Sequence, residues 1–330
     1  MANSYICGQT LDDIMRFAIE EIQSNGEWIT PSKGRCKELM GVILEITNPR
    51  ARLSRSETRG KLFSCLGALC WYLAGTNKLE FISYYIPEYK NYADGDEVFG
   101  GYGPRFFAWK GLNQVVNVTN LLRRKAESRK AIIQLFDATD IIEDHGDIPC
   151  TCAMQFMIRL NSLHMITYMR SNDVFWGLPH DIFTFTMLQE IMARSLGVEL
   201  GTYKHIVGSL HIYEKNTNLV QQFLNEGWQS TEMSMPTMPV GDPWSAIHSF
   251  LDAETIIRSG NLFDDSMLES LDVYWADLVR LLQVFNYSKY NDNDNIQKIK
   301  QKMASPTYRP FIDKKLGENQ RNRKRIYPIQ

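Results

Sequence analysis

The stretch from Ile148 to Asp181, IPCTCAMQFMIRLNSLHMITYMRSNDVFWGLPHD, decides the fold predicted for this chain. Apolar residues occupy alternate positions from Met154 to Leu160, which is the period of a β-strand with one buried face. Asn161-Ser162 is typical of a tight turn, and a second strand leads on from it to Arg170 and Ser171. The stretch therefore predicts a β-hairpin followed by a helix.

Cys150 follows a Gly146-Asp147 turn and directly precedes the first strand, so its thiol is expected at the mouth of that strand. The hairpin brings Arg170 and Ser171 back toward it, where they could hold an anion. A nearby cation favours the thiolate, which is the nucleophilic form of cysteine. The alternative is a buried structural cysteine, which is the commoner role of a single cysteine.

Several short motifs around Cys150, taken in order, resemble the signature of the thymidylate synthase family. That signature has Pro-Cys, a strand opening with Gln-Phe, then Arg-Ser-x-Asp-x-x-x-Gly-x-Pro-x-Asn, and later His-x-Tyr. The matching segments are Pro149-Cys150, Gln155-Phe156, Arg170-Ser171-Asn172-Asp173, Gly177-Leu178-Pro179 and His211-Ile212-Tyr213. So many ordered matches are more specific than any single motif. The resemblance runs from about Gly60 to Tyr213 and fades at both ends.

The resemblance implies an α/β (α+β) fold, with a large mixed β-sheet packed with helices, and a homodimer. It implies that Cys150 adds to C6 of a pyrimidine nucleotide and that 5,10-methylenetetrahydrofolate is the co-substrate. Arg170, Ser171 and Arg35 would hold the phosphate, with Arg129 and Lys130 reaching across from the partner subunit. The remaining matches are Gln155, His211 and Tyr213 for the nucleotide, Asp173, Tyr89 and Gly177 for the folate, and Tyr102 beside the reacting groups.

Asp181 is the first departure from the family pattern, because the family has an asparagine there that reads uracil. An amide can donate to O4 and accept from N3–H of uracil, whereas cytosine presents an amine donor and an N3 acceptor. A carboxyl group can accept from that amine, and can donate to N3 when it is protonated. This substitution resembles the cytidylate hydroxymethylase branch of the family. The alternative is that Asp181 only caps a helix running from Ile182 to Leu196.

Ala68 is the second departure, since the family carries a glutamate in this helix that orders water and moves protons. Alanine cannot relay a proton. Three interpretations follow: an impaired branch, recruitment of another group such as His180, or an inactivated form of a glutamate enzyme.

Other matches have ordinary structural alternatives. Tyr89 and Tyr92 stand where the family has tryptophans, and they either form a smaller wall that admits water or simply pack. Arg129 and Lys130 either contact phosphate or compensate a helix end, and lysine lacks the bidentate geometry of arginine. Arg35 could equally be a surface arginine, and weaker phosphate candidates are Arg50 and Arg52.

The composition narrows the function classes. The chain has 330 residues, 44% of them hydrophobic, and a net charge of −2, which favours a small anionic ligand over a polynucleotide. Its six cysteines include no C-x-x-C pair, so neither a zinc site nor a disulfide framework is expected. Without a signal peptide or a long apolar run, we expect a cytoplasmic protein with no membrane partner, no metal and no stable nucleic-acid partner.

Three regions are predicted: a catalytic core at residues 1–216, a helical part of the same domain at 217–290, and a polar linker with a basic tail at 291–330. The favoured function is C5 hydroxymethylation of CMP or dCMP. The alternatives are thymidylate-type C5 methylation of dUMP or UMP, and a catalytically silent nucleotide-binding homologue, which Ala68 favours.

Overall fold

The described residues form one mixed β-sheet of seven strands. The computed structural model describes residues 4–231, 234–261 and 263–326. The strand order is β1-β3-β7-β6-β5-β4, and β2 pairs with the beginning of β3. The strands are β1 (Tyr5–Gly8), β2 (Glu27–Ile29), β3 (Cys36–Ile46), β4 (Ile132–Gln134), β5 (Thr151–Arg159), β6 (Ser162–Asp173) and β7 (Glu199–Tyr213). The β1/β3 and β6/β7 pairs are parallel and the other pairs are antiparallel, which confirms the predicted mixed sheet.

The predicted hairpin is confirmed. Strands β5 and β6 pair in antiparallel register, and Leu160 and Asn161 between them have positive φ angles of 48° and 59°. Two successive residues with positive φ are typical of a turn that matches the twist of its strands. Met154, Phe156 and Ile158 of β5 are buried, as the alternation predicts, and so is Thr151. Leu160, the last residue of the predicted alternation, is instead exposed, because it lies in the turn after the strand.

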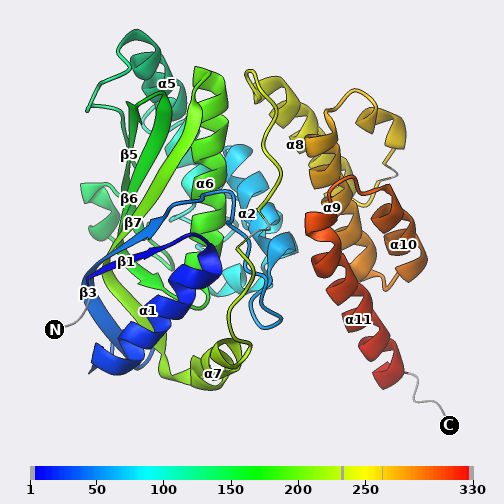
Figure 1. The fold of residues 1–330 in the computed structure, drawn as a ribbon, viewed down its shortest axis with the longest axis horizontal. Helices are drawn as coiled ribbons and strands as arrows, with labels where there is room; N and C mark the ends of the chain where they lie inside the picture. Colours follow the sequence, from blue (N-terminus) through cyan, green and yellow to red (C-terminus); the bar gives the residue numbers. More distant parts are fainter. Residues whose placement is uncertain (1–3, 232–233, 262, 327–330) are drawn as a thin grey trace.

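Helices pack on one face of this sheet. Helix α1 (Leu11–Asn25) begins with a capping box between Thr10 and Asp13. The long helix α6 (Gly177–Leu196) lies against β6 and β7, and α2 (Leu62–Leu73) packs on α6 (Figure 1). The shorter helices of the core are α3 (Leu79–Tyr85), α4 (Tyr102–Phe107), α5 (Gln114–Arg124) and α7 (Thr217–Asn225). The 3₁₀ turns are η1 (Pro87–Asn91), η2 (Ala138–Ile141), η3 (Glu214–Asn216), η4 (Asp265–Leu268) and η5 (Pro306–Tyr308).

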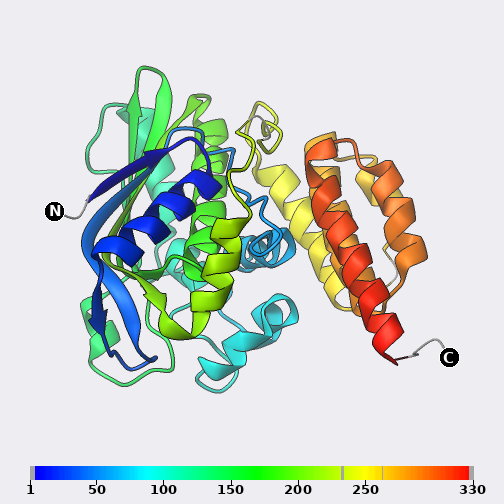
Figure 2. The same cartoon turned by 60° about the horizontal axis from the view of Figure 1, so that its bottom comes forward.

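The last part of the described chain is a separate group of helices on the far side of α2. These are α8 (Trp244–Arg258), α9 (Val273–Lys289), α10 (Asn293–Lys302) and α11 (Arg309–Ile326). Both views show them standing beside the sheet with α2 between (Figures 1 and 2). Residues 291–326, for which the sequence predicts a polar linker and a basic tail, instead contain α10 and α11, because Ile296, Ile299 and Ile312 give them a buried face.

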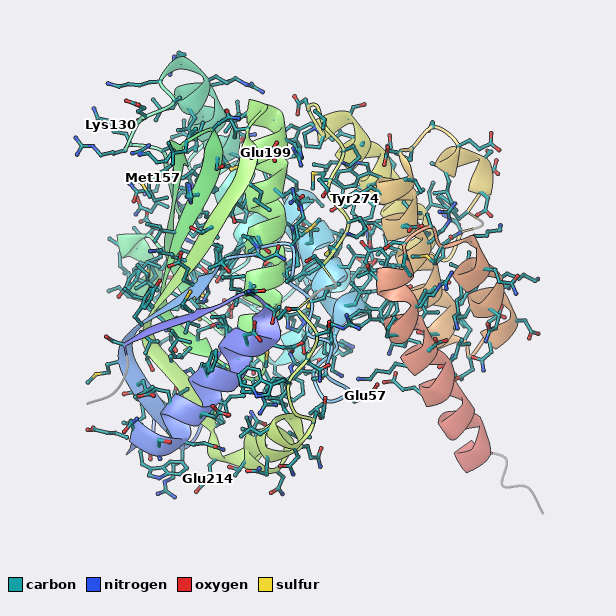
Figure 3. All side chains as sticks on the ribbon, viewed as in Figure 1. Glu57, Lys130, Met157, Glu199, Glu214 and Tyr274 are labelled. Carbon is teal, nitrogen blue, oxygen red and sulfur yellow. The ribbon has the colours of Figure 1, made fainter. Side chains whose placement is uncertain are left out.

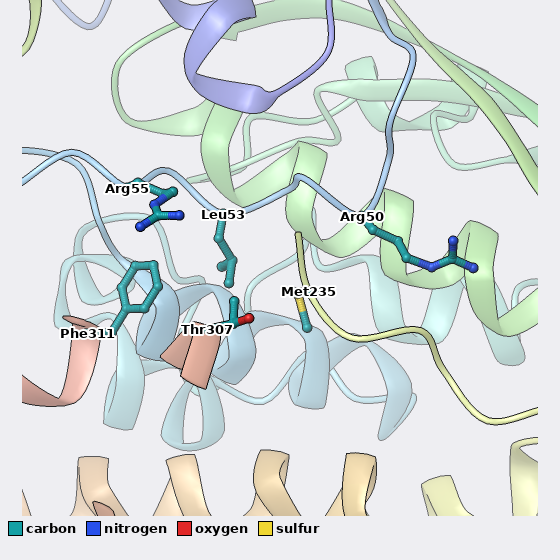
Figure 4. A pocket seen from close by; sticks show the side chains of 6 residues that line it. All are labelled: Arg50, Leu53, Arg55, Met235, Thr307 and Phe311. Carbon is teal, nitrogen blue, oxygen red and sulfur yellow. The ribbon is translucent and has the colours of Figure 1, made fainter. Parts of the chain in front are cut away.

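A buried ion cluster links the loop after β3, which carries Arg50 and Arg52, to Glu190 of α6. Glu190 of α6 is fully buried, accepts from Arg50 Nε at 2.7 Å, and forms an ion pair with the fully buried Arg52. Arg50 and Arg52, weak phosphate candidates in the sequence, therefore have a structural role. A small pocket between this loop and the residues Thr307 and Phe311 has Arg50 at its edge, and the Arg50 guanidinium is directed away from the pocket (Figure 4).

Candidate functional site

Cys150 lies at the mouth of β5, as predicted. Its carbonyl accepts from the backbone N–H of Arg170 at 2.8 Å, and a register shift between Thr151 and Ala153 bends the strand directly after it. The guanidinium of Arg170 donates to the carbonyls of Pro149 at 3.0 Å and Ile148 at 3.2 Å. The hairpin therefore fixes the loop that carries the thiol.

Tyr102 of α4 holds the next residue in place. Its hydroxyl oxygen accepts two hydrogen bonds from Thr151, one from the backbone N–H at 3.1 Å and one from Oγ1 at 2.9 Å. Tyr102 is buried, so these hydrogen bonds are shielded from solvent. Tyr102 therefore fixes the residue directly after Cys150.

The thiol of Cys150 is not activated by Arg170 alone. Burial raises its pKa to about 11, and the opposing effect of the Arg170 charge is smaller. The carboxyls of Asp147 and Asp181 raise this pKa further. Arg170 does favour the thiolate, as expected, but desolvation of the sulfur outweighs the effect of its charge, so the pKa of the thiol stays raised.

Asp147 is a site residue that the sequence reasoning missed. Its carboxyl lies close enough to Cys150 to affect the thiol, burial raises its own pKa, and its Oδ1 is 3.9 Å from Lys33 Nζ. Lys33 in turn lies 4.3 Å above the ring of Tyr92. The available signal was an acidic side chain three residues before the nucleophile. The site thus contains a carboxyl group although Ala68 has replaced the family glutamate.

Asp181 lies inside α6 and is not a helix cap. The helix begins at Gly177, with Trp176 as its N-cap residue, so Asp181 falls in the second turn. The expectation that the helix begins at Ile182 is wrong, since Pro179 is well tolerated in a first helical turn. Burial raises the pKa of Asp181 to about 7, and a hydrogen bond of 2.7 Å from Asn172 Nδ2 to Asp181 Oδ2 opposes that rise.

Ala68 stands in place of the family glutamate, and His180 is the residue that the sequence offers as a substitute for it. Ala68 of α2 is buried at 3% exposure and belongs to the apolar core. His180 Nε2 lies 2.9 Å from Ser64 Oγ, and its Nδ1 donates to the carbonyl of Trp176 at 3.1 Å. Burial lowers the pKa of His180 to about 4. At neutral pH the His180 ring is therefore uncharged, whereas a glutamate at position 68 would carry a negative charge.

Asp173 and Arg59 lie together on the side of the site where the sequence predicts the folate. Asp173 Oδ1 accepts from the backbone N–H groups of Phe175 at 2.7 Å and Trp176 at 3.2 Å. Arg59 is fully buried, lies 4.8 Å from the ring of Trp176, and has Nε and Nη1 without a hydrogen-bond partner among the described residues. Unpaired buried guanidinium nitrogens favour an anionic ligand. Arg59 was not identified from the sequence.

His211 and Tyr213 end strand β7 beside Asp173. His211 pairs with Asp173 across β6 and β7, and its Nδ1 donates to the carbonyl of Ser209 at 3.2 Å, which leaves Nε2 for a ligand. The rings of His211 and Tyr213 pack edge to face at 4.9 Å. Arg35, just before β3, forms a 2.7 Å ion pair with Glu214 and stacks on Trp28 at 4.3 Å.

Of the other predicted site residues, Gly177 and Ser171 lie next to Asp181 and Arg170, Tyr89 packs on Trp71, and Gln155 lies on the other face of the sheet. Tyr89 packs edge-on against Trp71 at 5.4 Å and its burial raises its pKa. Gly177 leaves space next to Asp181, and Ser171 follows Arg170 on β6. Gln155 instead donates to the carbonyl of Arg129 at 2.9 Å, five residues along β5 from Cys150, on the face of the sheet away from α6.

Arg129 and Lys130 are exposed and lie away from Cys150. They follow α5, which ends at Arg124, so the helix-end interpretation applies to Arg123 and Arg124 instead. Figure 3 shows Lys130 near Met157 on the side of the sheet opposite α6. The chain by itself therefore does not bring these two cations to its own nucleophile.

Among residues 4–231, 234–261 and 263–326 no group of three or more His, Cys, Asp or Glu side chains could hold a metal ion. Within the same ranges no helix has the length and hydrophobicity needed to cross a membrane.

Comparison with known proteins places this site in a family. The family model described as thymidylate synthase matches residues 36–254. Deoxyuridylate hydroxymethyltransferase of Bacillus phage SP01 is 29% identical over 61% of this chain and 55% of its own length. Proteins of the same name from Pseudomonas phage M6 (30% identical, 46% of this chain, 44% of the relative) and Delftia phage PhiW-14 (26%, 62% and 61%) also match.

The chain thus spans between 44% and 61% of the length of these relatives. The matched region contains the sheet core from β3 onward, Cys150, Arg170 and Asp181. It extends into α8 and leaves out α9 to α11. The chain belongs to the thymidylate synthase family.

Proposed function

We propose that this protein transfers a hydroxymethyl group to C5 of a cytidine nucleotide, CMP or dCMP, with 5,10-methylenetetrahydrofolate as co-substrate. Family membership supports folate-dependent modification of a pyrimidine nucleotide, and the names of the relatives support hydroxymethyl transfer. The cytosine assignment is the finer step. It rests on Asp181, which puts a carboxyl group where the family pattern has an amide.

The chemistry of Asp181 suits cytosine. A carboxyl oxygen accepts from the exocyclic amine, and a protonated carboxyl also donates to N3. Because burial raises the pKa of Asp181 to about 7, both protonation states are populated near neutral pH. The acid form matches both groups of the cytosine edge, and the carboxylate form matches the amine.

Cys150 is the proposed nucleophile. Its sulfur forms a bond to C6 of the pyrimidine, and the electron pair of the C5–C6 double bond is displaced toward C5, which becomes nucleophilic. The thiol proton has to leave in this step because the pKa of Cys150 is about 11, and the nearby Asp147 carboxylate can accept it. After C5 has gained the carbon unit and lost its proton, the sulfur leaves C6.

The folate supplies a one-carbon unit at the oxidation level of formaldehyde, and water supplies the hydroxyl oxygen, so no external reductant is needed. The residues present fit a folate. Arg59 offers two unpaired buried nitrogens to a carboxylate, and Asp173 retains Oδ2 after Oδ1 has accepted two backbone bonds. Tyr89 and Tyr92 are smaller than the family's tryptophans, which would let water reach the reacting carbon.

A second copy of the chain would complete the phosphate site. Arg129 and Lys130 are exposed on the open face of the sheet, and on that side Ile132 and Tyr168 have exposures of 48% and 45%. Apolar side chains on an uncovered sheet face are typical of a surface that associates. In a homodimer formed through this face, Arg129 and Lys130 would reach the partner's nucleotide beside Arg170.

A second candidate keeps the chemistry and changes the base. The printed names of the relatives specify deoxyuridylate, which favours a uridine nucleotide as substrate. The test is incubation of the protein with methylenetetrahydrofolate and each of CMP, dCMP, UMP and dUMP, followed by product mass. Addition of CH2O to a cytidine nucleotide is expected, addition of CH2 indicates methylation, and modification of uridine nucleotides alone overturns the proposal.

Two variants accompany this assay. Cys150→Ser controls for non-enzymatic transfer. Ala68→Glu restores the carboxyl group that the family carries at this position, and a large gain in turnover would show that Asp147 does not fully replace it. Complete absence of product in every reaction, including Ala68→Glu, would favour the silent nucleotide-binding homologue.

A further inference from the structure

A line of buried polar side chains leads from the sheet to Asp181. Tyr203 Oη lies 2.7 Å from His205 Nδ1 on β7, and His205 Nε2 lies 3.2 Å from Asn172 Oδ1 on β6. Asn172 Nδ2 then donates to Asp181 Oδ2 on α6 at 2.7 Å. We call Tyr203, His205 and Asn172 the relay. None of the three was predicted as a site residue from the sequence.

The relay has one direction of donation. Asn172 Oδ1 only accepts, so His205 Nε2 must carry a proton. Burial lowers the pKa of His205 to about 3, so the ring is neutral and Nδ1 has a lone pair. The hydroxyl of Tyr203 therefore donates to Nδ1. Every link donates toward Asp181, and reversing the Asn172 amide would require all the links to reverse together.

The surroundings are built to keep this arrangement. Tyr203 and His205 are fully buried, Asn172 is 5% exposed, and Phe185 of α6 stacks on the His205 ring with centroids 6.5 Å apart. Gly177 provides the space, because a Cβ there would lie 3.0 Å from Asn172 Nδ2 and 3.6 Å from Asp181 Oδ2. A polar network of this kind in a core is costly unless each group is satisfied.

The consequence concerns the symmetry of a carboxyl group. A free carboxylic acid can carry its proton on either oxygen, so either oxygen can be the donor and the other the acceptor toward a base. Uracil and cytosine have donor and acceptor exchanged at N3 and at the C4 substituent, so such an acid could bind either base. A donor held against Oδ2 makes Oδ2 the acceptor and places the proton on Oδ1.

We propose that the relay of Tyr203, His205 and Asn172 is a specificity device, which makes the two oxygens of Asp181 inequivalent so that the acid presents one donor–acceptor order and selects cytosine over uracil. Cytosine N3 then accepts from Oδ1–H, and its amine shares Oδ2 with Asn172. With uracil, N3–H would face Oδ1–H, and two donors cannot form a hydrogen bond. This inference rests on the proposed function and adds three positioning residues to it.

The test uses binding of CMP and UMP by the full chain, measured by titration calorimetry without folate. His205→Phe keeps the ring that stacks on Phe185 and removes both nitrogens, which frees Asn172 to turn its amide. We expect UMP affinity to rise and the CMP-to-UMP preference to fall by about tenfold. A purely structural defect would weaken both nucleotides alike, so a gain for UMP is specific to the relay.

Two further variants keep the result interpretable. Tyr203→Phe removes one oxygen atom and allows His205 to carry its proton on Nδ1, so a smaller shift in the same direction is expected even if His205→Phe fails to fold. His164→Phe makes the same substitution on β6, where Nδ1 lies 3.1 Å from Thr202 Oγ1 and forms no hydrogen bond with Tyr203, His205 or Asn172. This control should leave the preference unchanged.

Asp181→Asn separates the two levels of the proposal. If Asp181→Asn changes the preference whereas His205→Phe and Tyr203→Phe do not, the relay inference is overturned and base reading by Asp181 stands. If Asp181→Asn also leaves the preference unchanged, Asp181 does not read the base, and the cytosine assignment fails together with the relay. A fall in preference in all three variants, with His164→Phe unchanged, supports both.

Discussion

Arg170 donates from its guanidinium Nε to the carbonyl oxygen of Pro149 at 3.0 Å, and so ties the end of β6 to the residue before the nucleophile. The same side chain also reaches the carbonyl of Ile148 at 3.2 Å. Two of its donors are thereby directed at the backbone of the Cys150 loop. Arg170 therefore holds the loop that carries Cys150.

The first prediction concerns Cys150. Cys150→Ser should abolish release of tritium from C5 of the pyrimidine, because release requires covalent addition of the sulfur at C6. Nucleotide binding should be largely retained, since phosphate contacts come from other side chains. Calorimetric titration with CMP measures the retained binding, and Cys152→Ser, two residues further along the chain, is the matched control. Normal tritium release by Cys150→Ser would remove this residue from the mechanism.

The second prediction concerns the base. Asp181→Asn should move preference from cytidine toward uridine nucleotides, because an amide can donate to O4 and accept from N3–H. An unpaired buried polar group costs about 1–3 kcal/mol. The ratio of dissociation constants should therefore change by about tenfold to a hundredfold, both for CMP against UMP and for dCMP against dUMP. The measurement uses binding, so it does not depend on turnover.

The third prediction is a pH dependence of that ratio in the wild-type protein. The pKa of Asp181 is raised to about 7 by burial, with Asp147 raising it further and Asn172 lowering it. The acid form is the one that donates to cytosine N3, so the preference for CMP should be greatest below pH 7 and should decline as the pH rises through about 7. Phosphate ionisation is common to both nucleotides and cancels in the ratio. A ratio that stays constant from about pH 6 to about pH 9 would contradict this titration.

The fourth prediction tests whether Arg129 acts in trans. Mixtures of Cys150→Ser and Arg129→Ala subunits, allowed to exchange, should regain activity that neither variant has alone. A mixed dimer has one site with both defects and one with neither, so equal mixing should restore about one quarter of the wild-type sites. Arg123→Ala, a basic residue of α5, replaces Arg129→Ala in the control mixture. No recovery in the exchanged Arg129→Ala mixture would place Arg129 outside the partner's site.

The fifth prediction concerns stability. Glu190→Gln leaves the buried Arg52 without a compensating charge, which should lower the free energy of unfolding by about 3–5 kcal/mol. Glu214→Gln breaks the exposed ion pair with Arg35 and should cost at most about 1 kcal/mol. Urea denaturation of both variants gives the comparison. Equal effects would show that the buried cluster is not a determinant of stability.

The sequence by itself determined the strand-turn-strand unit around Cys150, because alternation and turn residues act locally. It also identified the family motifs and the two departures, Asp181 and Ala68, since both are matters of residue type at a known spacing. The start of α6 was mispredicted. Its first turn contains Gly177 and Pro179, which read as breakers in a sequence although both are compatible with a helix start.

Only the tertiary structure decided the protonation and surroundings of the site. Burial sets the pKa of Cys150 at about 11 and that of Asp181 at about 7, and burial depends on every element that packs around them. Asn172, His205 and Tyr203 meet because β6 and β7 pair in parallel beneath α6, and Asp147 comes near Cys150 through a loop. The contacts of Asn172 with His205 and Asp181 join different elements of the fold, so no local pattern records them.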